Sequence, residues 1–256
     1  SVADKLAIAR ALAELGVSYI EAGNPGSNPK DLEFFARCNT EVLGDSRLVA
    51  FGATRRKGMR AEEDPGLLAL VASGAGALVL VGKSSAVQVR EILGTTGEEN
   101  LAMIRDSIVY LVERGYEVFF DAEHFFDAYR EDPGYAMETL IAAEDAGASC
   151  LVLCDTNGGS FPTFVAEVTR AVVARGKTPV GIHCHDDCGL AVANSIAAVE
   201  AGAVHVQGVL VGFGERCGNT CLATLIPDLQ LKLGYACISE ERMKRLTRLT
   251  RQVAEV

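Results

Sequence analysis

The chain has 256 residues, of which 49% are hydrophobic and 23% charged, a composition typical of a folded soluble protein rather than a disordered one. Its formal net charge of −10 argues against a nucleic acid partner. No apolar run approaches the roughly 20 residues that cross a bilayer, and the opening SVADKLAIARALAELG lacks the layout of a signal peptide. We therefore expect a cytoplasmic protein that binds neither membrane nor nucleic acid.

Short apolar runs alternate along the chain with longer amphipathic segments. The chain opens on a predicted helix, roughly Val2 to Leu15, and seven strand-like runs follow it. They begin at Val17, Arg47, Gly76, Tyr116, Ser149, Pro179 and Val204. Their nearly continuous hydrophobicity is typical of parallel strands that are covered on both faces. The helix-like segments between them often end at a glycine, as in ALAELG, AAEDAGA and AAVEAGA.

This alternation predicts an α/β fold, either a (β/α)8 TIM barrel or a doubly wound open sheet. Seven strands beside eight crossover helices favour a barrel that lacks its first strand in this sequence. We expect one catalytic barrel domain over residues 1–236. A further helix, about Ser239 to Ala254, is expected within residues 237–256, leading to an accessory region absent from this sequence.

The eight cysteines raise the question of disulfides or a structural metal. A chain of this size can build a core without disulfides, and it shows no secretory signal, so reduced thiols are expected. Two C-x-x-x-C pairs, Cys184/Cys188 and Cys217/Cys221, leave a four-thiolate zinc site as a less favoured alternative.

Polar segments follow the predicted strands, at the end where barrel enzymes carry their chemistry. They include Thr54–Lys57, Gly82–Ser85, Asp121–Asp127, Cys154–Gly159, His183–Asp187 and Gly212–Asn219. Each is unremarkable alone, because surface loops are polar. Parallel strands end on one rim, however, so these carboxylates, imidazoles and basic groups should converge there.

Two histidines, two residues apart, end the strand that begins at Pro179. Side chains alternate along a strand, so His183 and His185 point the same way while Cys184 points into the packing. Such a pair is found in metal sites and in buried cores alike, and its place at the rim favours a metal site. Imidazoles with oxygen ligands suit Mg²⁺, Mn²⁺, Zn²⁺ or Co²⁺ better than Ca²⁺. Asn219 in the next rim loop is the predicted third ligand.

Other rim residues are candidates for catalysis and substrate binding. Glu123 follows a buried strand, where desolvation would raise its pKa and suit an acid/base role; the alternative is that it holds a neighbouring side chain. Thr156 and Asn157 could hydrogen-bond a substrate carboxylate, or simply form a turn. Arg55 and Arg56 could bind a phosphate-bearing cosubstrate, or belong to a solvated loop.

The quoted motifs resemble a known superfamily. GIHCHDDCGLAVANSIAAVEAGAVHVQG followed by GFGERCGN resembles the barrel signature of isopropylmalate, homocitrate and citramalate synthases, metal-dependent TIM barrels related to HMG-CoA lyase. Within it, YIEAGNPGSNPKD, FGATRRKG, TTGEENLAMIRDSIVYL, FDAEHFFDAYREDP and VLCDTNGG are similar to the citramalate synthases of the longer, bacterial type. The resemblance covers essentially the whole chain.

The resemblance implies a metal-dependent acyltransferase that condenses acetyl-CoA with pyruvate to (R)-citramalate and CoA, for isoleucine and leucine biosynthesis. It implies a divalent metal (Mg, Mn or Zn) and a homodimer. Alternatives on the same barrel are an isopropylmalate synthase or an HMG-CoA-lyase-like aldol lyase. A non-catalytic metal-binding barrel is an alternative from another class.

The resemblance also assigns roles to particular residues. Glu123 matches the family's active-site glutamate, and Thr156 matches the threonine that binds the oxo acid carboxylate. Glu215 belongs to the G-x-G-E-R-C-G-N loop that closes the metal site, and is a second catalytic candidate. Three residues match metal-site positions: His183, His185 and Asn219.

The sequence departs from the family pattern at several points. It lacks the D-T-T-L-R-D-G motif of the first strand, which supplies an arginine and a metal-binding aspartate, so we expect impaired catalysis from this chain alone. Asp186 and Val211 each stand where the family usually has Asn. Asn24 and Ser85 stand where related citramalate synthases have Trp, on the pocket wall, where they bear on substrate choice more than on metal binding.

Overall fold

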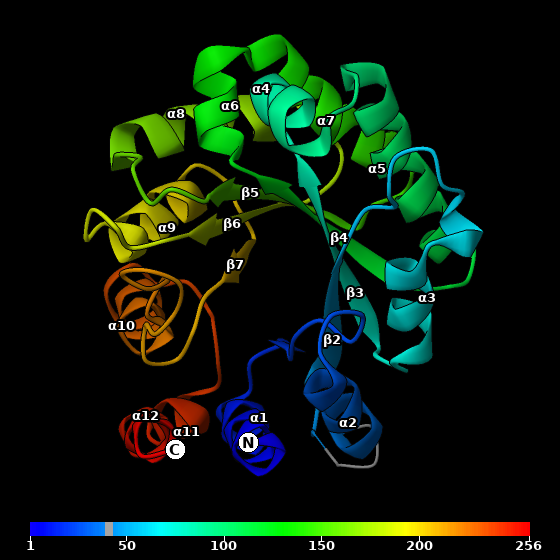
Figure 1. The fold of residues 1–256 in the computed structure, drawn as a ribbon. Coiled ribbons are helices and arrows are strands. Elements are labelled where there is room, and N and C mark those ends of the chain that lie inside the picture. Colours follow the sequence, from blue (N-terminus) through cyan, green and yellow to red (C-terminus); the bar gives the residue numbers. More distant parts are fainter. Residues whose placement is uncertain (39–42) are drawn as a thin grey trace.

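The structure is a computed structural model that describes residues 1–38 and 43–256. Seven parallel strands form one sheet in sequence order. They are β1 Tyr19–Glu21, β2 Arg47–Ala53, β3 Ala77–Lys83, β4 Glu117–Glu123, β5 Cys150–Asp155, β6 Val180–Cys184 and β7 His205–Gln207. The sheet curls, with helices along its outer side (Figure 1). In the described ranges β1 and β7 are not paired with each other. These seven strands, at the predicted positions, confirm the barrel-type fold.

Helices precede, connect and follow the strands. They are α1 Val2–Leu15, α2 Pro29–Cys38, α3 Pro65–Ala72, α4 Ala86–Gln88, α5 Gly97–Val112, α6 Phe125–Glu131, α7 Pro133–Asp145, α8 Pro162–Arg175, α9 Ala191–Glu200, α10 Leu222–Pro227, α11 Glu240–Met243 and α12 Leu246–Ala254. A 3₁₀ turn covers Ala61–Glu63, and π-helical turns cover Val89–Leu93 and Asp228–Lys232. In the described ranges no helix is both long and apolar enough to cross a membrane.

Local sequence signals fix several helix ends. The carboxylate of Asp64 accepts the backbone N–H groups of Gly66 and Leu67, and Pro65 occupies the first turn, where its missing N–H costs nothing. At the other end of a helix, α1 stops at Gly16, whose φ of 87° is readily adopted by glycine and disfavoured for other residues.

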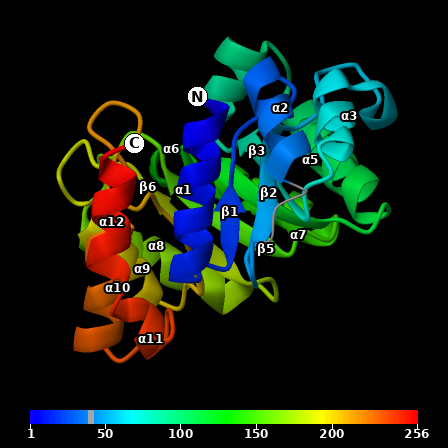
Figure 2. The same ribbon diagram turned by 90° about the horizontal axis from the view of Figure 1, so that it is seen from below.

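The prediction of one continuous helix over Ser239 to Ala254 is wrong, because α11 and α12 are separated by a turn at Lys244 and Arg245. Leu246 and Leu249 of α12 are buried in one cluster with Leu15 of α1, and the two helices lie side by side (Figures 1 and 2). The predicted domain boundary at residue 236 stays a prediction.

The core has two sides because strand side chains alternate. The larger cluster fills the space between the sheet and the helices. A smaller apolar cluster fills the inner side: Val49, Ala77, Val79, Phe119, Cys150, Val152 and Cys154. His205 joins the inner side by stacking on Phe119, with ring centroids 5.2 Å apart. Beyond this apolar layer, toward the carboxyl ends of the strands, the inner side becomes polar.

Candidate active site at the carboxyl ends of the strands

The strand register brings four polar side chains together on the inner rim. Lys83 of β3 is the register partner of Glu123 of β4, and His183 of β6 is the partner of Gln207 of β7. Alternation from buried Phe119 puts Glu123 on the inner face. The predicted convergence of carboxylate, imidazole and basic groups therefore occurs.

The three predicted metal ligands lie together. The rings of His183 and His185 have centroids 5.1 Å apart and are tilted by 40°. Asn219 reaches them because its backbone forms an isolated antiparallel bridge with His185. Its Nδ2 lies 3.0 Å from Nε2 of His183. Two imidazoles and one amide thus face one small region.

The state of His185 shows whether these side chains are suited to bind a divalent metal ion. This side chain is buried, and its Nδ1 has no hydrogen-bond partner. Burial, reinforced by the nearby His183, lowers the pKa of His185, which keeps the ring neutral, as metal binding requires. An orphaned nitrogen on a neutral ring fits a metal ligand. Among the described residues no group of three or more His, Cys, Asp or Glu side chains is placed to hold a metal ion.

The alternative four-thiolate zinc site is not formed. Cys184 is fully buried in the outer core, as predicted, whereas Cys188 and Cys217 are exposed and Cys221 is intermediate. All eight cysteines are free thiols. Because one thiol is fully buried and two are exposed, the four cysteines of the two C-x-x-x-C pairs do not share one environment in which they could bind a single ion.

Two acidic groups, Asp121 and Glu21, carry perturbed pKa values near His183. Asp121 is buried, and its Oδ1 accepts a hydrogen bond from Gln207 Nε2 at 2.9 Å. Burial raises the pKa of Asp121 to about 7. Glu21 is exposed at the end of the edge strand β1, and its pKa is raised first by desolvation and then by the negative charge of Asp121. Sequence motifs give Gln207 no role; only strand alternation could have indicated it.

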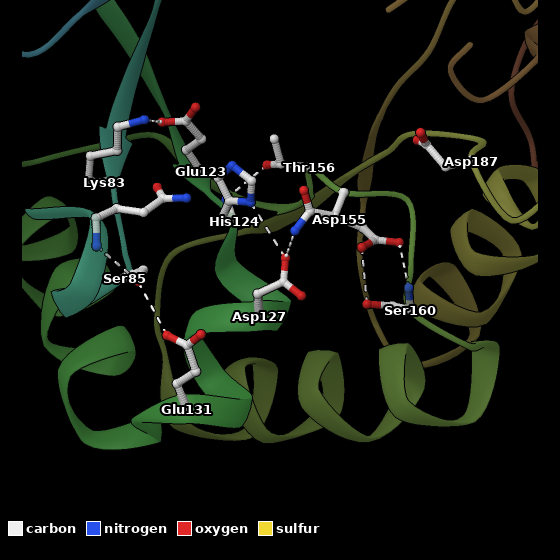
Figure 3. Close-up of polar contacts among 12 residues, drawn as sticks. Lys83, Ser85, Glu123, His124, Asp127, Glu131, Asp155, Thr156, Ser160 and Asp187 are labelled. Atoms are coloured by element: carbon white, nitrogen blue, oxygen red, sulfur yellow. Dashed lines mark hydrogen bonds and ion pairs between the residues drawn. The ribbon is translucent and has the colours of Figure 1, made fainter. Parts of the chain in front are cut away.

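Glu123 forms an ion pair at the rim. Its Oε2 lies 2.5 Å from Nζ of Lys83, and the two side chains are 26% and 19% exposed. Figure 3 shows this pair at the rim beside Thr156. A half-buried ammonium thus neutralises the predicted acid/base residue, and Lys83 joins the candidate site.

Thr156 and Asn157 contribute to a small network behind Glu123. The backbone N–H of His124 donates to Thr156 Oγ1 at 2.8 Å, and Asn157 Nδ2 donates to Asp127 at 2.8 Å. His124 Nδ1 lies 3.5 Å from the same Asp127 oxygen (Figure 3). His124 has a left-handed φ of 55°, a strained conformation that tends to occur at functional sites. Thr156 uses its oxygen as an acceptor here, so its hydroxyl proton can serve a ligand.

Arg55 is a structural cross-link, which argues against its predicted phosphate-binding role. Its side chain is 6% exposed, and its guanidinium pairs with Glu99 at 2.8 Å and with Asp106 at 2.8 Å. The backbone N–H of Arg55 also donates to Ser107 Oγ. Arg56 is exposed, and its role as a cation for an anionic ligand stays a prediction.

The G-x-G-E-R-C-G-N loop is pinned by its arginine rather than by its glutamate. Arg216 donates from Nε and Nη2 to both carboxylate oxygens of Asp187, at 2.7 and 2.9 Å, and from Nη2 to the Thr156 carbonyl at 2.6 Å. The Glu215 side chain is 80% exposed and lies 3.8 Å from Arg216. The catalytic role predicted for Glu215 stays a prediction, since its carboxylate is directed to solvent.

Comparison with known proteins places this geometry in a family. The family model described as HMGL-like matches residues 1–253. The chain belongs to the HMGL-like family. This confirms, at the family level, the resemblance that the rim motifs carry.

Within the HMGL-like family the similar curated relatives are synthases. The (R)-citramalate synthase of Synechocystis sp. is 48% identical over 264 residues, covering 100% of this chain and 48% of that protein. That of Streptomyces coelicolor is 49% identical over 257 residues, with the same coverage. The 2-isopropylmalate synthase of Sulfolobus acidocaldarius is 33% identical, covering 92% of this chain and 58% of that protein. The chain spans about half the length of the citramalate synthases it matches.

Solved structures share the HMGL-like fold along the whole chain. An HMG-CoA lyase from Bacillus subtilis superposes with a TM-score of 0.81 at 19% identity, covering 100% of this chain and 86% of that one. One from Brucella melitensis gives 0.79 at 18% identity, covering 100% and 92%. At this level of identity the likeness shows the fold alone.

Proposed function

We propose that this chain is the catalytic barrel of an (R)-citramalate synthase, an acyltransferase that condenses acetyl-CoA with pyruvate and water to give (R)-citramalate and CoA. One observation carries the proposal: relatives of that name match the whole chain at 48% and 49% identity, against 33% for the isopropylmalate synthase. The chain covers 48% of each of those two synthases, so the complete reaction belongs to the longer protein.

A divalent cation would be held by His183, His185 and Asn219. The orphaned nitrogen of His185 and the closeness of the two rings support this. Asn219 would offer its amide oxygen once the amide turns from the contact that its Nδ2 makes with His183. Two imidazoles with an oxygen ligand suit Mg²⁺, Mn²⁺ or Zn²⁺. Bound there, the cation would polarise the carbonyl of the oxo acid as a Lewis acid.

The other rim residues would position substrate and move protons. A methyl proton of acetyl-CoA leaves, the resulting carbanion forms a C–C bond to the keto carbon of pyruvate, and water then cleaves the thioester to release CoA. Glu123 would be the acid/base group, with Lys83 beside it. The Thr156 hydroxyl, with Asn157 behind it, would donate to the carboxylate of pyruvate, and Arg56 would meet a phosphate of CoA.

The test uses the complete gene product, because the chain spans about half of its relatives. Release of CoA thiol from acetyl-CoA is followed with pyruvate and with larger 2-oxo acids, with and without Mn²⁺, beside a His183→Ala variant. Blanks without substrate are required, since the chain itself carries eight free thiols. We expect Mn²⁺-dependent release with pyruvate that His183→Ala abolishes. Release only with a larger oxo acid, or cleavage of a hydroxyacyl thioester instead, would overturn the proposal.

The compartment and assembly state are part of the same proposal. The free thiols support a reducing compartment, the cytoplasm. The resemblance to the synthases supports a homodimer. Light scattering on the complete gene product tests the dimer, and a monomeric mass at micromolar concentration would contradict it.

A further inference from the structure

A line of hydrogen bonds crosses the inner side of the sheet from β4 to β7 and back to β6. Gln207 Nε2 donates to Asp121 Oδ1 at 2.9 Å, and Gln207 Oε1 lies 2.6 Å from Nδ1 of His183. Beyond the ring, Nε2 of His183 lies 3.0 Å from Nδ2 of Asn219. Two strands, β5 and β6, separate β4 from β7 in the sheet, so Gln207 spans the interior rather than bonding along it.

The chemistry of these groups gives the line one direction. Asp121 Oδ1 accepts a hydrogen bond from the NH₂ end of the Gln207 amide, as an acceptor oxygen of either the ionised or the protonated carboxyl can. The amide oxygen then faces His183, and it can only accept. Nδ1 of His183 must therefore carry the proton, which leaves Nε2 with its lone pair. The contact on the other side of the ring is consistent with this tautomer, because the NH₂ group of Asn219 approaches Nε2 as a donor.

The burial of these side chains makes the orientation firm. Asp121 is 5% exposed, and Gln207 and His183 are partly buried. Reversing the amide would turn its oxygen toward the carboxylate oxygen of Asp121 and its NH₂ toward Nδ1. With Asp121 ionised, the reversed amide would leave two acceptor oxygens facing each other with little water, which is costly at a buried site. Asp121 thus fixes the orientation of the Gln207 amide, and the amide oxygen fixes the tautomer of the His183 ring.

We propose that Gln207 is a positioning residue which, oriented by Asp121, holds His183 in the Nδ1–H tautomer and so keeps Nε2 available for a metal ion. The inference rests on the metal site of the proposed function and adds to it. Histidines that bind metals generally have the second ring nitrogen fixed by an outer hydrogen bond, and losing that bond typically costs about 10- to 100-fold in metal affinity. Gln207 would supply the bond as an amide, with the carboxylate of Asp121 one step further away.

The test reads the tautomer directly in the metal-free complete gene product labelled with nitrogen-15 histidine. Two-bond proton–nitrogen spectra distinguish the two neutral tautomers, and the His183 signals are assigned by their loss in His183→Ala. We expect the Nδ1–H form in the unmodified protein. Gln207→Met, similar in length but unable to accept this hydrogen bond, should shift His183 toward the Nε2–H form that free imidazoles favour. It should also weaken Mn²⁺ binding, measured by calorimetry, by about 10- to 100-fold.

Two further variants separate this role from general disruption. Gln207→Glu still offers an acceptor to Nδ1–H, and a proton on the Asp121 carboxyl would let the two carboxyls share one hydrogen bond, so the tautomer should be retained. Gln252→Met makes the same chemical change on α12, where Gln252 contacts Arg248 at an exposed site, and should alter neither the tautomer nor Mn²⁺ affinity.

Specific results would overturn the inference. An Nε2–H tautomer in the unmodified protein is one, and it needs no variant to fold. The Nδ1–H form together with unchanged Mn²⁺ affinity in Gln207→Met is another. Neither measurement uses substrate. A protein that shows the expected tautomer and Mn²⁺ binding but no CoA release would therefore overturn the proposed function and leave this inference standing.

Discussion

Lys83 and Glu123 are register partners at the carboxyl ends of β3 and β4, and the Lys83 ammonium nitrogen lies 2.5 Å from the Glu123 carboxylate. Both side chains are mostly buried and sit on the inner rim (Figure 3). An ion pair in this position is partly shielded from water, so each charge strongly influences the other. The two residues should therefore act as one unit.

Substitution of this pair should give strongly non-additive kinetics. Glu123→Gln removes the acid/base group, and we expect kcat to fall by about 10²- to 10⁴-fold. Lys83→Met should cost about tenfold alone but almost nothing in the Glu123→Gln background, because its partner charge is already gone. Steady-state kinetics of the two single variants and the double variant measure this coupling. Effects that simply multiply would contradict it.

The parts of the site that the sequence predicts are those set by a single strand. His183 and His185 share a face because their spacing matches the period of two. The same rule predicts that Cys184 points away, as it does. The seven strands could be located because their hydrophobicity is continuous. Local periodicity therefore sufficed for the fold and for the imidazole pair.

The parts that could not be predicted depend on register or on contacts between distant segments. Lys83 and Glu123 are 40 positions apart in the sequence, and they meet only because β3 and β4 align Lys83 with Glu123. Gln207 lies in a strand of three residues without a motif. Arg55 belongs to a basic run that suggests an exposed loop, yet its partners lie 44 and 51 positions away, on α5. Sequence spacing contains no direct sign of such pairings.

Substitutions of Arg55 and Arg56 should have very different effects on the free energy of unfolding, although the two residues are neighbours in the sequence. Arg55→Met leaves Glu99 and Asp106 without their shared partner and should lower the free energy of unfolding by about 1–3 kcal/mol. Arg56→Met alters an exposed side chain and should change it by less than about 0.5 kcal/mol. Urea unfolding of both variants measures the difference. Equal effects would show that Arg55 is not the cross-link.

The Arg55 effect should also depend on pH. Hydrogen bonds from Arg55, and then from the Gly58 backbone N–H, lower the pKa of Glu99 below its ordinary value of 4.5. A carboxyl whose pKa is lowered by folding stabilises the folded state above its unfolded pKa and loses that contribution as the pH falls through the folded value. The stability gap between the original protein and Arg55→Met should thus be full near pH 7 and shrink below about pH 4.5. A gap that widens in acid would contradict this.

Gly214 should be required for the metal site because of the space that Asn219 occupies. A Cβ at position 214 would lie 1.8 Å from Asn219 Oδ1. Gly214→Ala must therefore displace the Asn219 side chain from its present position, and we expect Mn²⁺ affinity to fall at least about tenfold, the range for a disturbed ligand environment. Gly159→Ala is the matched control, since nothing lies within 4 Å of its added Cβ. Equal Mn²⁺ affinity in the two variants would remove Asn219 from the site.

Arg216 should matter through geometry rather than through charge. Its guanidinium bonds both oxygens of Asp187 and the carbonyl of Thr156, fixing the loop that carries Asn219 against β5 and β6. Lysine keeps the charge, but its single ammonium cannot reproduce the forked contact. Arg216→Lys should therefore lower kcat/KM by about tenfold while the stability of the fold is nearly unchanged, because exposed ion pairs contribute little to it.

A matched substitution isolates this geometric effect. Arg248→Lys alters an arginine on α12 that pairs with Glu14 at the surface, far from the rim loops in the sequence, and its kinetics should match those of the unmodified protein. Mn²⁺ affinity should fall in Arg216→Lys, because the displaced loop carries the amide of Asn219 with it. If Arg216→Lys kept both kcat/KM and Mn²⁺ affinity, the contact between Arg216 and Asp187 would be a surface ion pair with no part in holding the site.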